Sequence, residues 1–291
     1  MSVSMRVERV GFTTLQDLGR PGWAHLGVPH SGAADRASHA LANRLAGNAA
    51  TAATLETSGG LVARAWHDMV VVLTGADCDA FVDGAPLSRC RATHVAAGKV
   101  IRIERMRVGV RSYLAIAGGI DGTVMLGSQS HDTLSSIVPQ PLTDGVVLHI
   151  GTAQRDHCSL DVPIEPTRKG SIRLSRGPHT ELIPDATLRH VTTAMWSVSE
   201  ASNRIGVRLT ATQANIASTT GLLGGQLLGE LDSMALVRGA VQLTPSGELV
   251  VMLADHPTTG GYPVVAVVHP DDVDGVGQLE PETTLKLLLI D

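Results

Sequence analysis

The chain is organised around one stretch, Asp255-His256-Pro257-Thr258-Thr259-Gly260-Gly261-Tyr262-Pro263. Apolar runs rich in β-branched residues precede it at Leu249–Ala254 and follow it at Val264–Val268, and each is short enough for a strand. The two glycines allow a positive φ or a close approach of the backbone to a ligand. A carboxylate, two hydroxyls and one of only two tyrosines surround them, so a site is about as well supported as a rigid turn.

Composition favours a mainly β fold, because 31 glycines and 14 prolines in 291 residues supply many turns. Only 2% of the residues are aromatic, so Val, Leu, Ile and Ala must fill the core. The net charge of −5 and the lack of Lys/Arg runs argue against nucleic-acid and anionic-membrane binding. There is no apolar run of membrane-spanning length and no signal-peptide pattern, so we expect a cytoplasmic protein.

The cysteines and histidines show no metal-ligand spacing. Cys78, Cys90 and Cys158 have no close-pair spacing and are expected to be reduced thiols. The 12 histidines are scattered without H-x-x-x-H spacing. We therefore expect no metal site in this chain.

Short strands separated by turn signals are predicted over much of the chain, a spacing typical of barrels and sandwiches. Met5–Gly11 alternates like an edge strand, and Gly75–Asp77 is predicted as a turn. Ala240–Thr244 is predicted to form a hairpin with Leu249–Ala254. Further strands are predicted at Met69–Thr74, Ala80–Val82, Val100–Ile103, Ser112–Ala117, Gly145–His149, Ile172–Ser175, Trp196–Val198 and Val207–Leu209.

The clearest predicted helix begins at Asp35, with Asp35 or Ser31 as its N-cap and Gly47-Asn48 as its stop. Its predicted apolar face contains Ala37, Leu41 and Leu45. Asn43 on this helix fits either a buried hydrogen bond or a substrate contact.

A second, short helix is predicted around residues 181–189, and residues 211–236 show no clear pattern. Residues 161–170 contain prolines and charges without an apolar period and are predicted to be a linker. We therefore predict two domains, residues 1–165 and 166–291.

Arg20 lies between Gly19 and Pro21 in a long glycine-rich loop, so its guanidinium is expected to be held in one place. It suits recognition of a carboxylate or phosphate, and an ion pair with Asp17 or Asp35 is the equally weighted alternative.

Ser128, Ser130, His131 and Asp132 bring the residue types of a catalytic triad into one short segment. Triads are usually built from distant positions, and the chain has no G-x-S-x-G elbow. A polar loop is therefore the preferred interpretation.

Several segments together resemble the biotin-dependent carboxyltransferase A/B-domain family. Its members are variously named allophanate hydrolase subunit 2, urea amidolyase-related protein and the C-type subunit of 5-oxoprolinase. The resemblance covers nearly the whole chain. It is carried by Thr14–Gly22, Gly27–Pro29, Ser31–Asp35, Leu41–Leu45, Gly47-Asn48, Leu73–Asp77, Ala115–Ile120, Ala254-Asp255 and Pro257–Pro263. The chain departs from the family at Glu230–Met234, where Ser-Glu-Gly is usual, and after Asp132, where a glycine-rich turn is usual; both departures bear on substrate identity.

The resemblance implies a mainly β chain with two cyclophilin-like β-barrel domains and a few short helices. It also implies a smaller partner with the remaining carboxyltransferase subdomains, named allophanate hydrolase subunit 1 or the B-type subunit of 5-oxoprolinase. With a third protein, the A-type subunit of 5-oxoprolinase, members of the family form an ATP-dependent 5-oxoprolinase that opens 5-oxo-L-proline to L-glutamate. Two alternatives stay open: a carboxyltransferase acting on urea or another amide, and a non-catalytic subunit of a kinase-inhibitor complex.

Neither a biotin-attachment tetrapeptide nor a phosphate loop is present, so ATP or biotin would be held by partner chains. Opening an amide requires donors for a developing oxyanion and a group that moves a proton. The candidate catalytic residues are Asp255, as the base, and Tyr262. The candidate substrate-binding residues are Arg20, Thr258, Thr259, Gly260 and Gly261.

Overall fold

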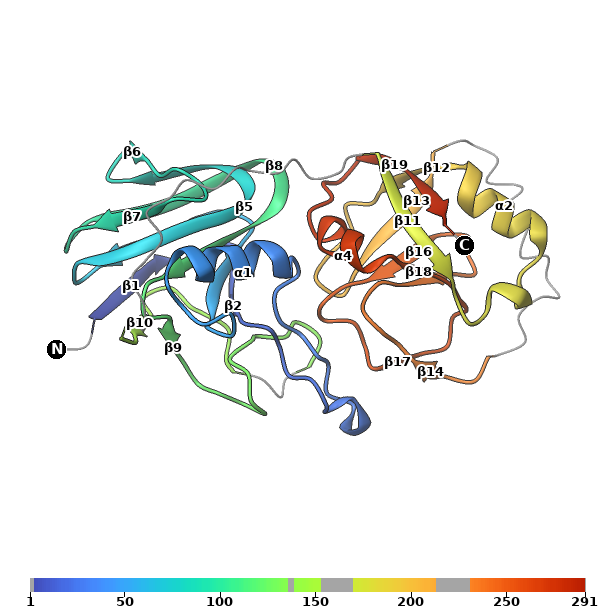
Figure 1. The fold of residues 1–291 in the computed structure, drawn as a ribbon, viewed down its shortest axis with the longest axis horizontal. Coiled ribbons are helices and arrows are strands. Elements are labelled where there is room, and N and C mark those ends of the chain that lie inside the picture. Colours follow the sequence, from blue (N-terminus) through green and yellow to red (C-terminus); the bar gives the residue numbers. More distant parts are fainter. Residues whose placement is uncertain (1–2, 136–138, 153–169, 213–230, 291) are drawn as a thin grey trace. The chain divides into compact units, whose positions relative to one another are not determined.

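The computed structural model describes residues 3–135, 139–152, 170–212 and 231–290. Contacts divide the chain into two compact units, and each is described by itself (Figure 1). The first contains Met1–Pro21 and Ser31–Pro166, and the second contains Gly22–His30 and Thr167–Asp291. The predicted boundary at residue 165 and most of the predicted linker lie outside the described residues, so that boundary stays a prediction. Cys158 and most of the unassigned stretch 211–236 also lie outside them.

The first unit is built on a ten-stranded sheet in which the path β2-β3-β8-β4-β1-β10-β9 is joined by β5, β6 and β7. A bridge joins Ala53, directly before β3, to Ile120 of β9 at the far end of this path, so the sheet curls into a half-barrel. The strands are β1 (Val3–Arg9), β2 (Thr13–Gln16), β3 (Thr54–Thr57), β4 (Leu61–Ala65), β5 (Met69–Val82), β6 (Ala85–Pro86), β7 (Ala92–Val95), β8 (Val100–Ile116), β9 (Ile120–Asp121) and β10 (Val147–Ile150).

β1 is not the edge strand that its alternating pattern suggested. It pairs with β10 on one side and with β4 on the other, both antiparallel. Met5 and Val7 point into the core with no exposed surface, whereas Arg6 and Glu8 are exposed. Alternation reports one buried face of a strand, and it carries no information on whether both edges are paired.

Two pairs of predicted short strands are each one long strand, β5 and β8. The predicted turn at Gly75–Asp77 is wrong, because β5 runs through it with shifts of register against β8. Gly75 has φ +85°, and a Cβ there would lie 2.5 Å from the carbonyl oxygen of Arg111. The glycine therefore marks a bulge and a close backbone approach within a strand.

Helix α1 (Arg36–Leu45) lies at the predicted position. The Asp35 carboxylate accepts a hydrogen bond from the backbone nitrogen of Ser38 at 2.9 Å, so Asp35 is the N-cap. The chain leaves the helix through Gly47, whose φ is +74°.

The buried face of α1 differs from the predicted one. Ala37 is exposed, and the buried positions are His39, Ala42, Asn43 and Leu45. Asn43 Nδ2 donates to the carbonyl oxygen of Ala52 at 2.7 Å. Asn43 thus has the first of its two expected roles, a buried hydrogen bond that ties α1 to the chain before β3.

The second unit is a closed barrel with the order β11-β18-β15-β16-β13-β12-β19. Parallel pairing of β11 with β19 closes it, and its other strand pairs are antiparallel. Its strands are β11 (Ser171–Arg176), β12 (Met195–Val198), β13 (Gly206–Ala211), β15 (Ala240–Leu243), β16 (Leu249–Met252), β18 (Val264–Val268) and β19 (Thr284–Leu289). The predicted hairpin is confirmed, since β15 pairs with β16 from Val241 opposite Val251 to Leu243 opposite Leu249.

Aliphatic side chains fill the barrel as the composition predicted, with Trp196 as its one fully buried indole among the described residues. The segment predicted as a short helix forms the 3-10 helix η2 and then α2. The remaining elements are η1 (Ala24–Leu26), η2 (Thr180–Leu182), α2 (Asp185–Thr193), α4 (Pro270–Val276) and a ribbon of β14 (Met234–Ala235) with β17 (Thr259–Gly260). The predicted mainly β architecture with two barrel-type domains and a few short helices is confirmed, one barrel being closed and the other a curled half-barrel.

Candidate functional site

The predicted site is the loop Asp255–Pro263, which leaves the barrel after β16 and returns to it at β18. Its middle part forms β17, which pairs with β14 through Met234 opposite Gly260 and Ala235 opposite Thr259. The backbone nitrogen of Leu236 also donates to the carbonyl oxygen of Thr258 at 2.9 Å. The middle of the 255–263 loop is therefore held against β14 by backbone hydrogen bonds, and Figure 1 shows β14 and β17 side by side.

Asp255 is fully buried at the start of the loop and forms a two-point ion pair with Arg204. Arg204 Nε donates to Oδ2 at 2.9 Å and Nη2 donates to Oδ1 at 3.0 Å. The backbone nitrogen of Asp255 donates to the carbonyl oxygen of Arg204 at 3.0 Å. Parallel charge-assisted bonds of this kind fix both partners, so the geometry favours Asp255 as an anchor of the loop. Its predicted role as a base stays a prediction.

His256 is a titratable residue of the loop that was absent from the predicted set. Its side chain is 7% exposed, and Nδ1 lies 2.7 Å from the carbonyl oxygen of Pro257. Burial lowers the pKa of this imidazole, against smaller upward effects of the Pro257 hydrogen bond and the Asp255 charge. The sequence did offer a signal: this is the one side chain of the loop whose ordinary pKa lies near neutrality.

The two glycines differ in their surroundings. Neither has a positive φ, so of the two expected reasons for glycine the left-handed backbone does not apply at either position. A Cβ on Gly260 would lie 2.8 Å from Gln242 Nε2 and 2.8 Å from Leu236 Cδ1, whereas one on Gly261 would meet nothing closer than 3.8 Å. Gly260 is thus required by close packing, and Gly261 lies in an open part of the loop.

The exposed part of the loop consists of Thr259, Gly261 and Tyr262, with Thr258 and Gly260 half-buried. Tyr262 is 48% exposed, and its carbonyl oxygen accepts a hydrogen bond from Gln242 Nε2 at 3.0 Å. A barrel side chain therefore holds the backbone of Tyr262 while the ring stays accessible.

Arg20 belongs to the first unit, where its side chain is 1% exposed. Its Nη2 donates to the backbone carbonyl of Ser130. This contact ties the guanidinium to the segment 128–131. The predicted role of Arg20 as a substrate clamp stays a prediction.

Asp17 organises the same region. Its carboxylate accepts hydrogen bonds from the hydroxyls of Ser128 at 2.6 Å and Ser130 at 2.5 Å, and from the backbone nitrogens of Gln129 and Gly19, both at 2.7 Å. Four donors on one carboxylate hold the loop of Arg20 against the segment 128–131.

The residues of the considered Ser-His-Asp triad point to other partners. Both serine hydroxyls donate to Asp17, and His131 Nδ1 donates to the carbonyl oxygen of Pro139 at 3.1 Å. Asp132 accepts hydrogen bonds from the backbone nitrogens of Leu134 and Ser135. This is the polar loop that the sequence favoured, because the hydroxyls do not donate to the imidazole.

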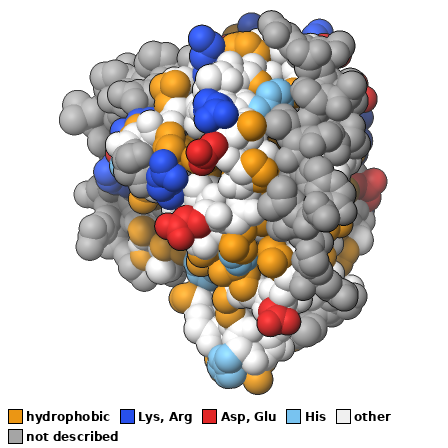
Figure 2. Space-filling model, turned by 90° about the vertical axis from the view of Figure 1, so that its right-hand side faces the viewer, with side chains coloured by type: hydrophobic (Ala, Val, Ile, Leu, Met, Phe, Trp, Pro, Cys, Tyr) orange, Lys and Arg blue, Asp and Glu red, His pale blue; other side chains and the backbone are white. Residues whose placement is uncertain are grey.

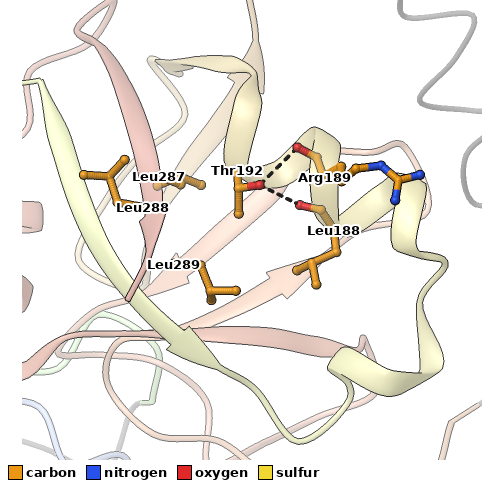
Figure 3. A pocket seen from close by; sticks show the side chains of 6 residues that line it. All are labelled: Leu188, Arg189, Thr192, Leu287, Leu288 and Leu289. Carbon is orange, nitrogen blue, oxygen red and sulfur yellow. Dashed lines mark hydrogen bonds between the residues drawn. The ribbon is translucent and has the colours of Figure 1, made fainter. Parts of the chain in front are cut away.

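An open pocket of about 360 Å³ lies elsewhere on the second unit, between α2 and β19 (Figure 3). The Thr192 hydroxyl in it lies 3.1 Å from the carbonyl oxygens of both Leu188 and Arg189, within its own helix. Leu287, Leu288 and Leu289 form the other wall. The pocket is thus largely aliphatic, and its hydroxyl is directed to the helix backbone rather than to a ligand.

Other surfaces and clusters add no further site. In the part of the chain that the structure describes, no three His, Cys, Asp or Glu side chains come together as metal ligands. No helix among the described residues has the length and apolar character needed to cross a membrane. The face shown in Figure 2 carries Lys and Arg beside Asp and Glu rather than a field of one sign.

Comparison with known proteins gives three informative similarities. The chain is 34% identical over 280 residues to the C-type subunit of 5-oxoprolinase from Escherichia coli (strain K12), covering 94% of this chain and 87% of the relative. The solved structure of TTHA0988 is 31% identical with a TM-score of 0.85, and the match covers 100% of this chain and 56% of that one. Kluyveromyces lactis urea carboxylase is 26% identical with a TM-score of 0.84, and this chain spans 28% of its length.

The sequence pattern of the family described as carboxyltransferase domain, subdomain A and B, matches residues 26–288. That range includes the barrel, the 255–263 loop and most of the first unit. The chain therefore belongs to the carboxyltransferase subdomain A and B family.

Proposed function

We propose that this chain is one component of an ATP-dependent 5-oxoprolinase, which opens 5-oxo-L-proline to L-glutamate and acts only with partner chains. The observation that carries the proposal is the end-to-end correspondence with a relative named as the C-type subunit of 5-oxoprolinase. Urea carboxylase, by contrast, is matched over little more than a quarter of its length. The match to the 5-oxoprolinase subunit therefore covers most of both chains, and the first function is preferred on that ground.

The chemistry assigned to the 255–263 loop is that of a weakly reactive amide. The backbone nitrogen of Gly261 supplies a donor for the oxyanion that develops on the amide carbonyl, whereas the backbone of Gly260 lies opposite Met234 in the β14–β17 ladder. The half-exposed ring of Tyr262 and the hydroxyls of Thr258 and Thr259 contact the substrate. This assignment is supported by the exposure of the loop and by the buried anchor beneath it.

A carboxylate-binding role for Arg20, in the first unit, is proposed separately from the chemistry of the loop, because a planar guanidinium grips a carboxylate through two parallel hydrogen bonds. ATP is assigned to another subunit, since this chain has no phosphate loop.

A second candidate function is transfer of a carboxyl group to urea, with biotin carried on another chain. Two observations favour it: the family description and the fold match to urea carboxylase. Both candidates use the same loop and differ in substrate.

The test is carried out on the complex assembled from this chain and its co-expressed partner proteins. We expect ATP hydrolysis to rise on addition of 5-oxoproline and glutamate to form in step with it. Urea with bicarbonate serves as the competing substrate, and a complex lacking this chain is the control. ATP hydrolysis that responds to urea and not to 5-oxoproline would replace the first function by the second.

A further inference from the structure

The orientation of the His256 ring fixes the position of its proton. A carbonyl oxygen only accepts hydrogen bonds, so Nδ1, which lies 2.7 Å from the carbonyl oxygen of Pro257, must be the donor. In the neutral ring the other nitrogen, Nε2, then carries a lone pair. Nε2 has no hydrogen-bond partner among the described residues.

Another imidazole of the second unit shows the opposite arrangement. His179 Nδ1 accepts a hydrogen bond from the backbone nitrogen of Val264 at 3.0 Å, so its neutral ring carries the proton on Nε2. Nε2 of His256 is thus a hydrogen-bond acceptor in the neutral ring, whereas Nε2 of His179 is a donor. The difference lies in the backbone group that each Nδ1 faces.

Burial lowers the pKa of His256 and so favours the neutral ring near pH 7, and the charged groups around it have smaller effects. Asp255 raises the pKa of the ring and Arg238 lowers it, and burial exceeds both effects. Asp255 is itself paired with Arg204, and Arg238 with Asp274 at 2.7 Å. Neighbouring charges are thus largely compensated, and a neutral imidazole is available to take a proton.

We propose that His256, through Nε2, is the general base of the 255–263 loop. The inference rests on the proposed amide-opening function and deepens it. Asp255 is a weaker choice because both of its oxygens accept hydrogen bonds from Arg204 inside the protein. Nε2 of His256 lies in the same loop and has an open lone pair.

The proton moves from water to the leaving nitrogen by way of the imidazole. An attacking water gives a proton to Nε2 while its oxygen bonds to the amide carbonyl carbon. The resulting imidazolium returns the proton to the ring nitrogen of 5-oxoproline as the C–N bond breaks. The products are the new carboxyl group and the amine, and the imidazole is regenerated.

The first experiment is independent of activity. Nitrogen-15 NMR of the histidine-labelled protein at pH 7, with His256→Asn to assign the signal, reports which ring nitrogen carries the proton. We expect a neutral ring protonated on Nδ1. A ring protonated on Nε2, or an imidazolium at pH 7, would overturn the proposal.

The second experiment measures turnover by the assembled complex. His256→Asn places an amide nitrogen near the position of Nδ1 and keeps a donor for Pro257, but it removes Nε2. We expect kcat to fall about 10²–10⁴-fold with an unchanged melting temperature and intact partner binding. His269→Gln, at the N-cap of α4, is the matched control and should keep full turnover.

The pH profile separates a base from a merely structural histidine. In the wild-type complex kcat/KM should fall as the pH drops through the lowered pKa of His256, below about 6.5, because the protonated ring cannot act as a base. This acid limb should be lost in His256→Asn, and added imidazole should restore part of the turnover of His256→Ala. Full turnover in His256→Asn, with an active wild-type complex, would sink the base role and leave the proposed function standing. A wild-type complex without 5-oxoproline-dependent turnover would remove both.

Discussion

At the scale of single residues, the 255–263 loop begins on a buried ion pair. Asp255 has no exposed surface, and Arg204 is 8% exposed. Removing one partner of such a pair leaves a buried charge without compensation, which typically costs about 3–5 kcal/mol, whereas apolar replacement of both partners is often neutral. If Asp255 is a structural anchor, its substitution should lower stability. If Asp255 is a catalytic base, the same substitution should lower turnover in a stable protein.

We expect Asp255→Asn to lower the free energy of unfolding by about 3–5 kcal/mol, because the Arg204 guanidinium loses its counter-charge. Asp255→Leu combined with Arg204→Met should recover most of this loss. Chemical denaturation of the three proteins measures both effects. A double variant no more stable than Asp255→Asn would contradict the anchoring role, and a stable Asp255→Asn protein without turnover would restore Asp255 as the base.

At the scale of secondary-structure elements, the β14–β17 ribbon determines which glycine tolerates a side chain. Gly260 packs against Gln242 and Leu236, and the Gln242 amide holds the carbonyl of Tyr262. Gly261 has open space on its Cβ side. The adjacent glycines thus differ in the tertiary neighbours that a Cβ would meet.

Gly260→Ala should therefore displace the Gln242 amide from Tyr262 and destabilise the loop by about 1–3 kcal/mol, the typical cost of breaking a buried hydrogen bond. Gly261→Ala should stay within about 0.5 kcal/mol of the wild type. The Gly261→Ala variant also keeps the backbone N–H of residue 261, so it should preserve the proposed oxyanion donor. Thermal melts and hydrogen exchange of β17 measure the difference, and equal effects of the two changes would refute this account of the ribbon.

At the scale of the whole molecule, the comparisons indicate how the chain is completed. TTHA0988 is a single chain of which this protein matches 56%, so the matched part is joined there to a further region. The relatives named as C-type subunits of 5-oxoprolinase imply additional subunits. Under the proposed function, a partner protein carries the corresponding region.

We expect co-expression with a smaller protein carrying the remaining carboxyltransferase subdomains, the B-type subunit, to give a stable complex. Size-exclusion chromatography with light scattering would give its mass, and a larger complex should form on further addition of the A-type protein. His269→Gln should leave assembly unchanged. Recovery of the chain without its partner, from cells that produce both, would count against this arrangement.

Local signals predicted local structure well. The Asp35 cap, the hairpin of β15 and β16 and the extent of β18 each depend on neighbouring residues, and each was predicted from its own segment. Predictions failed where a distant strand decides the outcome. Gly75 has the local signature of a turn, but the carbonyl of Arg111 approaches it inside a paired strand.

The sequence by itself determined the mainly β class, the family and the loop Asp255–Pro263, because periodicity, turn chemistry and ordered motifs are properties of contiguous residues. Only the tertiary structure decided what each side chain of that loop faces. Arg204 reaches Asp255 from 51 positions away, and Gln242 reaches the carbonyl of Tyr262 from 20 positions away. Partners brought together by pairing of distant strands, such as β13 with β16, leave no mark in a local pattern, since burial and pairing arise only when those strands meet.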